Sequence, residues 1–158
     1  MDMDMMFTPA ISELVKTLIG KGATKLEDEK QIATLRMLLR ERIRREARFN
    51  RELLNHTKLD LNVRLDNLKT EALEYACGQP LPIEILFSGE LNSALMQLLA
   101  GDSAKHRMHF ARLQTEADLI ERLLHRVKLA QLRANEDVSP GDVSYLKKLN
   151  NATHAAMS

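Results

Sequence analysis

The chain has 158 residues, with 23 lysines and arginines against 22 aspartates and glutamates, and a formal net charge of +1. This length is sufficient for one domain with its own hydrophobic core, and the near-neutral balance excludes the global positive field that attracts nucleic acid. Only 6 glycines and 4 prolines are present, which disfavours a loop-rich or all-β fold. We therefore expect an all-α protein.

The N-terminal segment 1–7 has neither the basic start nor the apolar run of a signal peptide, so we expect a flexible tail and a cytoplasmic protein. Thr8 and Pro9 are typical of a helix start, because a hydroxyl caps free N–H groups and proline is tolerated in the first turn. Apolar residues then recur at steps of three and four: Ile11, Leu14, Val15, Leu18 and Ile19. A first helix is predicted over about 8–19.

A long helix is predicted over about 25–56. Thr24 and Glu27 have the spacing of a capping box, in which each side chain accepts a hydrogen bond from the other's backbone N–H. An apolar stripe follows without any Gly or Pro: Ile32, Leu35, Leu39, Ile43, Ala47 and Leu54. At about 1.5 Å per residue the helix is roughly 45 Å long, so it needs a long partner to pack against.

Residues 58–65 alternate apolar and polar side chains, as a half-buried strand does. An isolated strand would leave its backbone groups unpaired, and no second strand is available in the sequence. An extended connector or a distorted helix start is therefore the better prediction. Helical spacing resumes between Leu68 and Ala76, and Gly78 is placed for a left-handed C-terminal cap.

Pro80 and Pro82 break the chain, because neither can continue a helix. The apolar segment that follows predicts a further helix, split near Gly89 and ended by Gly101.

Cys77, the only cysteine, cannot form an internal disulfide. Its apolar neighbours favour a small buried side chain in a reducing compartment.

A second long helix is predicted over about 104–135, because apolar residues recur there at alternating steps of three and four: Phe110, Leu113, Ala117, Ile120, Leu124 and Val127. The simplest bundle lays 25–56 and 104–135 side by side as an antiparallel pair, covered by the shorter helices. Ser139 and Pro140 start a last helix. We expect about six helices, one domain over 8–150, a flexible C-terminal tail over 151–158, and no membrane span.

Seven arginines and only two glutamates lie within 36–51, a local excess of five positive charges. Four of these arginines stand at four-residue steps and form what we call the arginine ridge: Arg36, Arg40, Arg44 and Arg48. Such a ridge can bind a row of phosphates or carboxylates. The alternative is a solvated helix face that pairs with acidic residues of a neighbouring helix or subunit, with Glu116, Asp118 and Glu121 as candidates. The alternative is favoured, since no Tyr or Trp is interleaved for base stacking.

Arg51 and His56 are separated by four residues, a spacing that resembles the arginine and histidine motif of HEPN-type ribonucleases. The resemblance covers these six residues alone. It implies an all-helical dimer in which the two side chains act on the RNA 2′-hydroxyl and the scissile phosphate, chemistry that suits imidazole and guanidinium. Residues five apart on a regular helix point about 140° apart, so this pair needs a helix end or a dimer partner to converge.

His106 and His109 lie three residues apart and could present two imidazoles to a metal ion. Two neutral ligands are not a site, and the sequence has neither a cysteine pair nor the Glu-x-x-His motif of di-iron bundles. Nucleophile, phosphate-loop and dinucleotide motifs do not occur in it either. We therefore expect exposed histidines, no metal and no cofactor.

Together these patterns favour a non-enzymatic helical interaction module that forms a homodimer or binds another protein. The prediction depends on the apolar repeat of 104–135, the length of 25–56, and the lack of a convergent catalytic set. The alternative is a nucleic-acid-directed protein that binds through the arginine ridge or cleaves RNA with Arg51 and His56.

Overall fold

The computed structural model describes residues 25–79, 81–101 and 104–158. Eight helices lie in this part of the chain, six of them at least seven residues long, and no strand forms within it. In chain order the helices are α2 (Lys25–Leu54), α3 (Leu61–Asp66), α4 (Glu71–Cys77), α5 (Ile83–Leu86), α6 (Ser93–Ala100), α7 (Ala104–Phe110), α8 (Glu116–Leu132) and α9 (Pro140–Ala156). The prediction of an all-α bundle with long helices packed together is confirmed. The tail predicted over 1–7 and the helix predicted over 8–19 lie outside the described residues.

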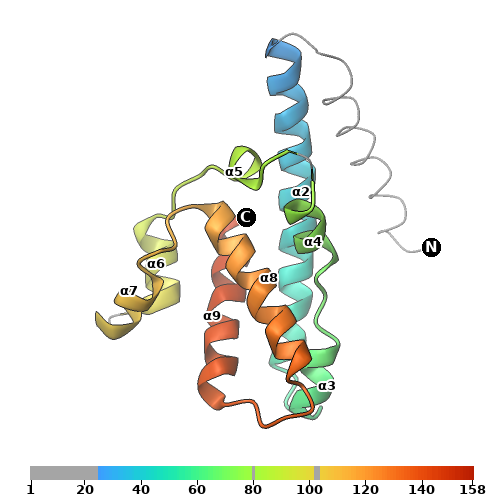
Figure 1. The fold of residues 1–158 in the computed structure, drawn as a ribbon, viewed down its shortest axis with the longest axis vertical. Coiled ribbons are helices and arrows are strands. Elements are labelled where there is room, and N and C mark those ends of the chain that lie inside the picture. The colour runs from blue at the N-terminus through green and yellow to red at the C-terminus, as the bar shows by residue number, and fades with distance from the viewer. Residues whose placement is uncertain (1–24, 80, 102–103) are drawn as a thin grey trace, which may run out of the picture.

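Helix α2 is the longest element and packs along α9 (Figure 1). Its buried positions follow the predicted stripe: Leu35, Leu39, Ile43, Ala47 and Leu54. The two helices are antiparallel, because Arg40 donates to the carbonyl of Ala156 at the end of α9, whereas the Ala47 carbonyl accepts from Asn150 earlier in α9. The antiparallel partner of α2 is therefore α9 and not the segment 104–135.

The continuous helix predicted over 104–135 is wrong, since residues 111–115 separate α7 from α8. The cause is a capping box at the start of α8. The Thr115 hydroxyl accepts from the Asp118 amide at 3.2 Å, and the Asp118 carboxylate accepts from the Thr115 amide at 3.1 Å. In a continuous helix these two amides would donate to backbone carbonyls of the preceding turn. Here side chains accept from them instead, so a new helix can begin at Glu116.

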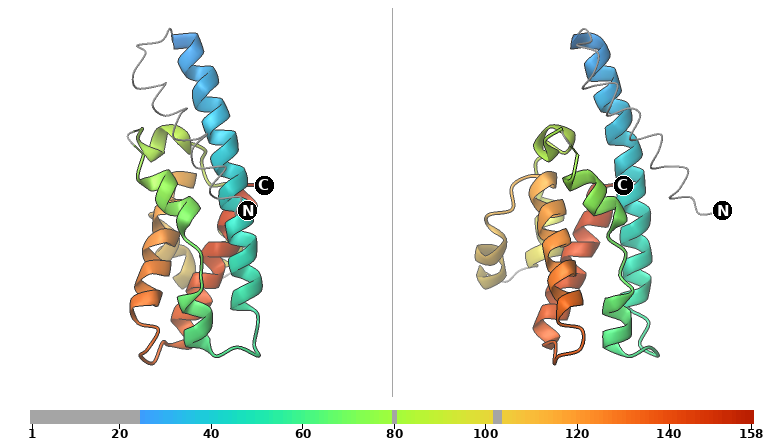
Figure 2. Two further views of the ribbon diagram at one scale, coloured as in Figure 1. Left: turned by 90° about the vertical axis from the view of Figure 1, so that its right-hand side faces the viewer. Right: turned by 45° about the vertical axis from the view of Figure 1, so that its right-hand side comes forward.

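Helix α8 runs in the same direction as α2. Its first residue, Glu116, pairs with Arg40, while Gln131 near its end donates to the carbonyl of Leu68, close to α3. Figure 2 shows α6 and α7 on the side of α9 that faces away from α2. The bundle is thus built around α2, α8 and α9, with the shorter helices outside them.

The C-terminal tail predicted over 151–158 is also wrong. Helix α9 continues to Ala156, and Ala152 and Thr153 have no exposed surface. Small residues suggested a tail by composition, but small side chains also fit where two helices pack closely. Ser139 and Pro140 start α9 as predicted, and the Ser139 hydroxyl accepts from the Asp142 amide.

The connecting segments follow most of the local predictions. Residues 58–65 form a turn and α3, as expected of a distorted helix start. Gly89 lies in the connector between α5 and α6, and Gly101 ends α6 with φ of 57°, a conformation that favours glycine. Gly78 is different from the prediction. It has φ of −93°, so it is not a left-handed cap.

Buried polar side chains hold α4 against α2. The Glu46 carboxylate accepts from the amides of Ala72 at 2.9 Å and Leu73 at 3.4 Å, which are free donors in the first turn of α4. Cys77, at the end of α4, packs against the core, and burial raises the pKa of its thiol to about 11. Among the described helices, none combines the length and apolar character needed to span a membrane.

Candidate functional site

The arginine ridge changes its surroundings along α2. An α-helix turns by about 100° per residue, so each four-residue step displaces the next member of the ridge by about 40° around the axis. Over three steps this drift moves the side chains from the edge of the core toward solvent. The side chains of Arg40 and Arg44 are 29% and 31% exposed, whereas that of Arg48 is 63% exposed.

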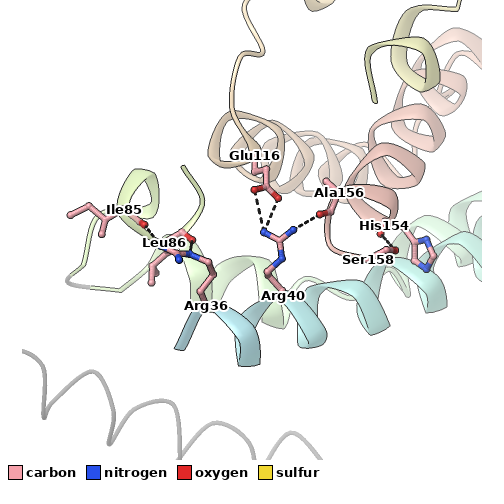
Figure 3. A network of polar contacts seen from close by, with 8 residues as sticks. All are labelled: Arg36, Arg40, Ile85, Leu86, Glu116, His154, Ala156 and Ser158. Carbon is pink, nitrogen blue, oxygen red and sulfur yellow. Dashed lines mark hydrogen bonds and ion pairs between the residues drawn. The ribbon is translucent and has the colours of Figure 1, made fainter. Parts of the chain in front are cut away.

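Arg36 binds the end of α5. Its Nε donates to the Leu86 carbonyl at 2.6 Å, and its Nη2 donates to the Ile85 carbonyl at 2.9 Å (Figure 3). Carbonyl groups in the last turn of a helix have no partner within that helix, and a charged donor suits them. Arg36 therefore holds the short helix α5 against α2.

Arg40 joins three helices. Its Nη1 forms an ion pair with Glu116 Oε2 at 2.9 Å, and its Nη2 donates to the Ala156 carbonyl at 2.6 Å (Figure 3). Glu116 lies in the first turn of α8 and Ala156 in the last turn of α9, so each helix end meets the charge that favours its dipole. Glu116 is thus the candidate acidic residue that contacts the ridge.

Gly89 completes the contact around Glu116. The Gly89 carbonyl accepts from the Glu116 amide at 2.8 Å. A Cβ atom at position 89 would overlap the Glu116 carboxylate. We call the group formed by Arg40, Gly89, Glu116 and Ala156 the Arg40 junction. Asp118 instead caps its own helix. The pKa of Glu121 is raised first by burial and then by the negative charges of Glu84 and Asp118.

The second half of the ridge pairs with glutamates of α2 itself. Arg44 donates to both oxygens of Glu41, at 2.6 and 3.0 Å, and Arg48 lies 3.8 Å from the Glu52 carboxylate. The hydrogen bonds from Arg44, and then Arg45, hold the pKa of Glu41 below its ordinary range. Exposed pairs of this kind contribute little stability, and a guanidinium with five donors can still bind a further anion.

His154, in the last turn of α9, lies beside this exposed half. Burial lowers the pKa of His154, and the positive charges of Arg51, Arg44 and Arg48 lower it further. We call these four residues the His154 cluster. The sequence did not identify His154 as a site residue, because only the antiparallel packing of α9 on α2 brings it to the ridge.

The structure does not bring Arg51 and His56 together. The positive charge of Arg51 lowers the pKa of His154. His56 is instead exposed in the turn after α2, where its amide donates to the Leu53 carbonyl. Across the described ranges, no hydrogen bond or ion pair joins Arg51 to His56.

His106 and His109 are exposed on α7, and no three potential metal ligands are grouped among the residues that the structure describes.

Comparison with known proteins gives no relative for this chain: no family model, no curated protein and no solved structure matches it. The chemistry that remains comes from the residues themselves. Arg36 and Arg40 are engaged in holding helix ends, and the His154 cluster gathers positive charge with only Arg48 mostly exposed.

Proposed function

We propose that this chain is a non-enzymatic helical interaction module that pairs with a second copy of itself through the first turns of α2. The observation behind the proposal is that these turns extend beyond every other described helix (Figure 1). A helical segment of about ten residues is marginally stable in water unless it packs against a partner. A second copy would supply that partner.

An exposed face that runs from these turns to the level of α5 supports the proposal. Lys30, Ala33 and Met37 are exposed at steps of three and four, so they lie on one face of α2, and Met37 is 63% exposed. Closed twofold dimers need one surface that binds a second copy of itself. Two antiparallel copies of this face would bury Met37 and Ala33 against each other.

Sedimentation equilibrium of the full chain tests the proposal. We expect the wild type to form a dimer and Met37→Glu to weaken it by at least tenfold in dissociation constant, since a charge would replace an apolar contact. Leu132→Glu is the matched control, because Leu132 is 83% exposed at the end of α8. A monomeric wild type would refute the proposal, as would equal weakening by both variants.

The alternative is a nucleic-acid-directed protein, and the positive charge of the His154 cluster favours it. Phosphates would bind Arg44, Arg48 and Arg51 with strong salt dependence. Binding to a mixed RNA and DNA pool at low salt, lost in the double variant Arg44→Gln/Arg48→Gln, would support this candidate. Absence of binding at low salt excludes it, and RNA cleavage lost in His56→Ala with folding intact would instead favour the ribonuclease.

A further inference from the structure

A cleft of about 590 Å³ opens between α7, α8 and the first turns of α9, at a different place from the arginine ridge. Its size is in the range of small-molecule sites, about 300 to 1,000 Å³. The residues that give it chemical character come from all three helices: Lys105, His106, His109, Arg126, Tyr145 and Lys148. None of these residues takes part in the Arg40 junction or the His154 cluster.

The cleft has an excess of positive charge. Lys105, Arg126 and Lys148 line it against one carboxylate, that of Asp142. Gly141, in the first turn of the 17-residue helix α9, lines it as well. The first N–H groups of a helix bear partial positive charge and are a common binding place for phosphate.

Two basic groups from different helices meet at the cleft. Lys148 Nζ of α9 lies 3.4 Å from His106 Nδ1 of α7. The ammonium group has three N–H donors, so an anionic oxygen in the cleft can accept from those that do not point to His106. The contact therefore suits a bound anion.

Arg126 is held rigidly with its hydrogen-bonding capacity unmet. Its guanidinium lies over the ring of Tyr145, 4.6 Å from the centroid. Its Nε is buried and has no hydrogen-bond partner among the described residues. Arg126 lines the cleft, so its positive charge is available to an anionic group of a ligand there.

The other wall of the cleft is aromatic and apolar. Phe110 and Tyr145 stack with ring centroids 5.2 Å apart, and His109 packs edge-on against both. Tyr145 is fixed further by Arg122, whose Nη1 donates to its hydroxyl at 2.9 Å. Met108, 80% exposed, lies at the rim. A ligand with a planar or apolar body can therefore lie against His109 and Met108.

We propose that this cleft binds a small organic phosphate, with the phosphoryl group at Lys105, Arg126 and Lys148 and a planar or apolar body against His109 and Met108. Three cations and a helix N-terminus suit a phosphate dianion better than a single carboxylate. The proposal is independent of self-association, because the cleft is remote from the first turns of α2 along the chain and its residues all come from one copy.

Calorimetry of the full chain at low ionic strength tests the proposal with three probes: adenosine 5′-monophosphate, adenosine and inorganic phosphate. We expect the nucleotide to bind at least about tenfold more tightly than adenosine, because adenosine lacks the charged group. Inorganic phosphate should bind at the same site more weakly, since it lacks the planar body. No saturable binding of the nucleotide at millimolar concentration, or equal affinity for adenosine, would overturn the proposal.

Variants of neighbouring lysines locate the site. Lys148→Ala and the exposed Lys105→Ala should each weaken nucleotide binding about tenfold, through loss of a charge-assisted hydrogen bond. Lys147→Ala removes the same charge one residue away on α9 without touching the cleft. Unchanged binding in Lys147→Ala supports the assignment. Equal weakening by Lys147→Ala and Lys148→Ala would show only a general charge effect and overturn it.

Discussion

Arg40 of α2 and Glu116 of α8 form an ion pair of 2.9 Å although they are 76 positions apart in the chain, and Glu116 is only 8% exposed. The same guanidinium binds the last turn of α9. Arg40 therefore ties the start of α8 and the end of α9 to the middle of α2. The ion pair contributes to the stability of the fold because Glu116 is buried, and a buried carboxylate without a partner is costly.

Arg40→Met should lower the free energy of unfolding by about 2 kcal/mol, because it leaves the Glu116 carboxylate and the Ala156 carbonyl without their donor. Urea denaturation of the variant measures this loss. Arg45→Met is the control. Arg45 is half exposed and its ion pair with Glu41 lies on the surface, so the substitution should cost less than about 0.5 kcal/mol.

Adding Glu116→Gln to Arg40→Met should recover part of the lost stability, since the amide removes the unpaired charge. If Arg40→Met costs no more than Arg45→Met, the ion pair is not a stabilising contact of the bundle.

Gly89→Ala should lower the free energy of unfolding by about 2 kcal/mol, because the new methyl group must displace a Glu116 side chain that Arg40 holds in place. Gly141→Ala is the matched control, since a Cβ there meets only the Ser139 hydroxyl at 3.8 Å. The cost of Gly89→Ala should shrink in a Glu116→Ala background. An equal cost in both backgrounds would contradict the proposed clash.

Glu46 should make stability fall as pH rises. Burial raises the pKa of Glu46 above its ordinary value of 4.5, and this outweighs the amide bonds from Ala72 and Leu73 and the charge of Arg42. The folded protein therefore holds this proton more tightly than the unfolded chain. The stability of the protonated form is lost as pH rises from 4.5 through the raised pKa.

Urea denaturation at a series of pH values tests this linkage. The free energy of unfolding of the wild type relative to Glu46→Gln should decrease across that window and then level off. Glu41 gives the opposite sign, because Arg44 lowers its pKa. Its contribution should be present above 4.5 and be lost as pH falls through the lowered pKa. Equal slopes for Glu46→Gln and Glu41→Gln would contradict these assignments.

Arg51→Gln should raise the pKa of His154 toward its ordinary value of 6.5, because Arg51 is the first of the three charges that lower it. An NMR titration of the imidazole measures the change. Burial also lowers this pKa, so the shift should be reversed only in part. Arg133→Gln, at the C-terminal cap of α8, should leave the titration unchanged. No change in Arg51→Gln would mean that the charge of Arg51 does not lower the pKa of His154.

Local patterns predicted α2 well. Its apolar stripe has no Gly or Pro to interrupt it, and helix propensity, stripe and packing agree from Leu35 to Leu54. The prediction over 104–135 failed because apolar spacing reports which residues are buried and not the path of the backbone. Phe110, Leu113 and Ala117 are all buried, although the chain is not helical at 111–115. The spacing of Thr115 and Asp118 was the sequence signal for the break.

The sequence by itself determined the helical class, the long helix α2, the caps that start α9, and the presence of four arginines in one row. These features depend on interactions within a few residues of one another. Only the tertiary structure decided what the row does. The direction of α9 and the position of Glu116 follow from packing between distant segments, and the drift of about 40° per step around α2 then divides the ridge. Arg36 and Arg40 consequently hold helix ends, while Arg44 lies half-buried and Arg48 lies exposed near His154.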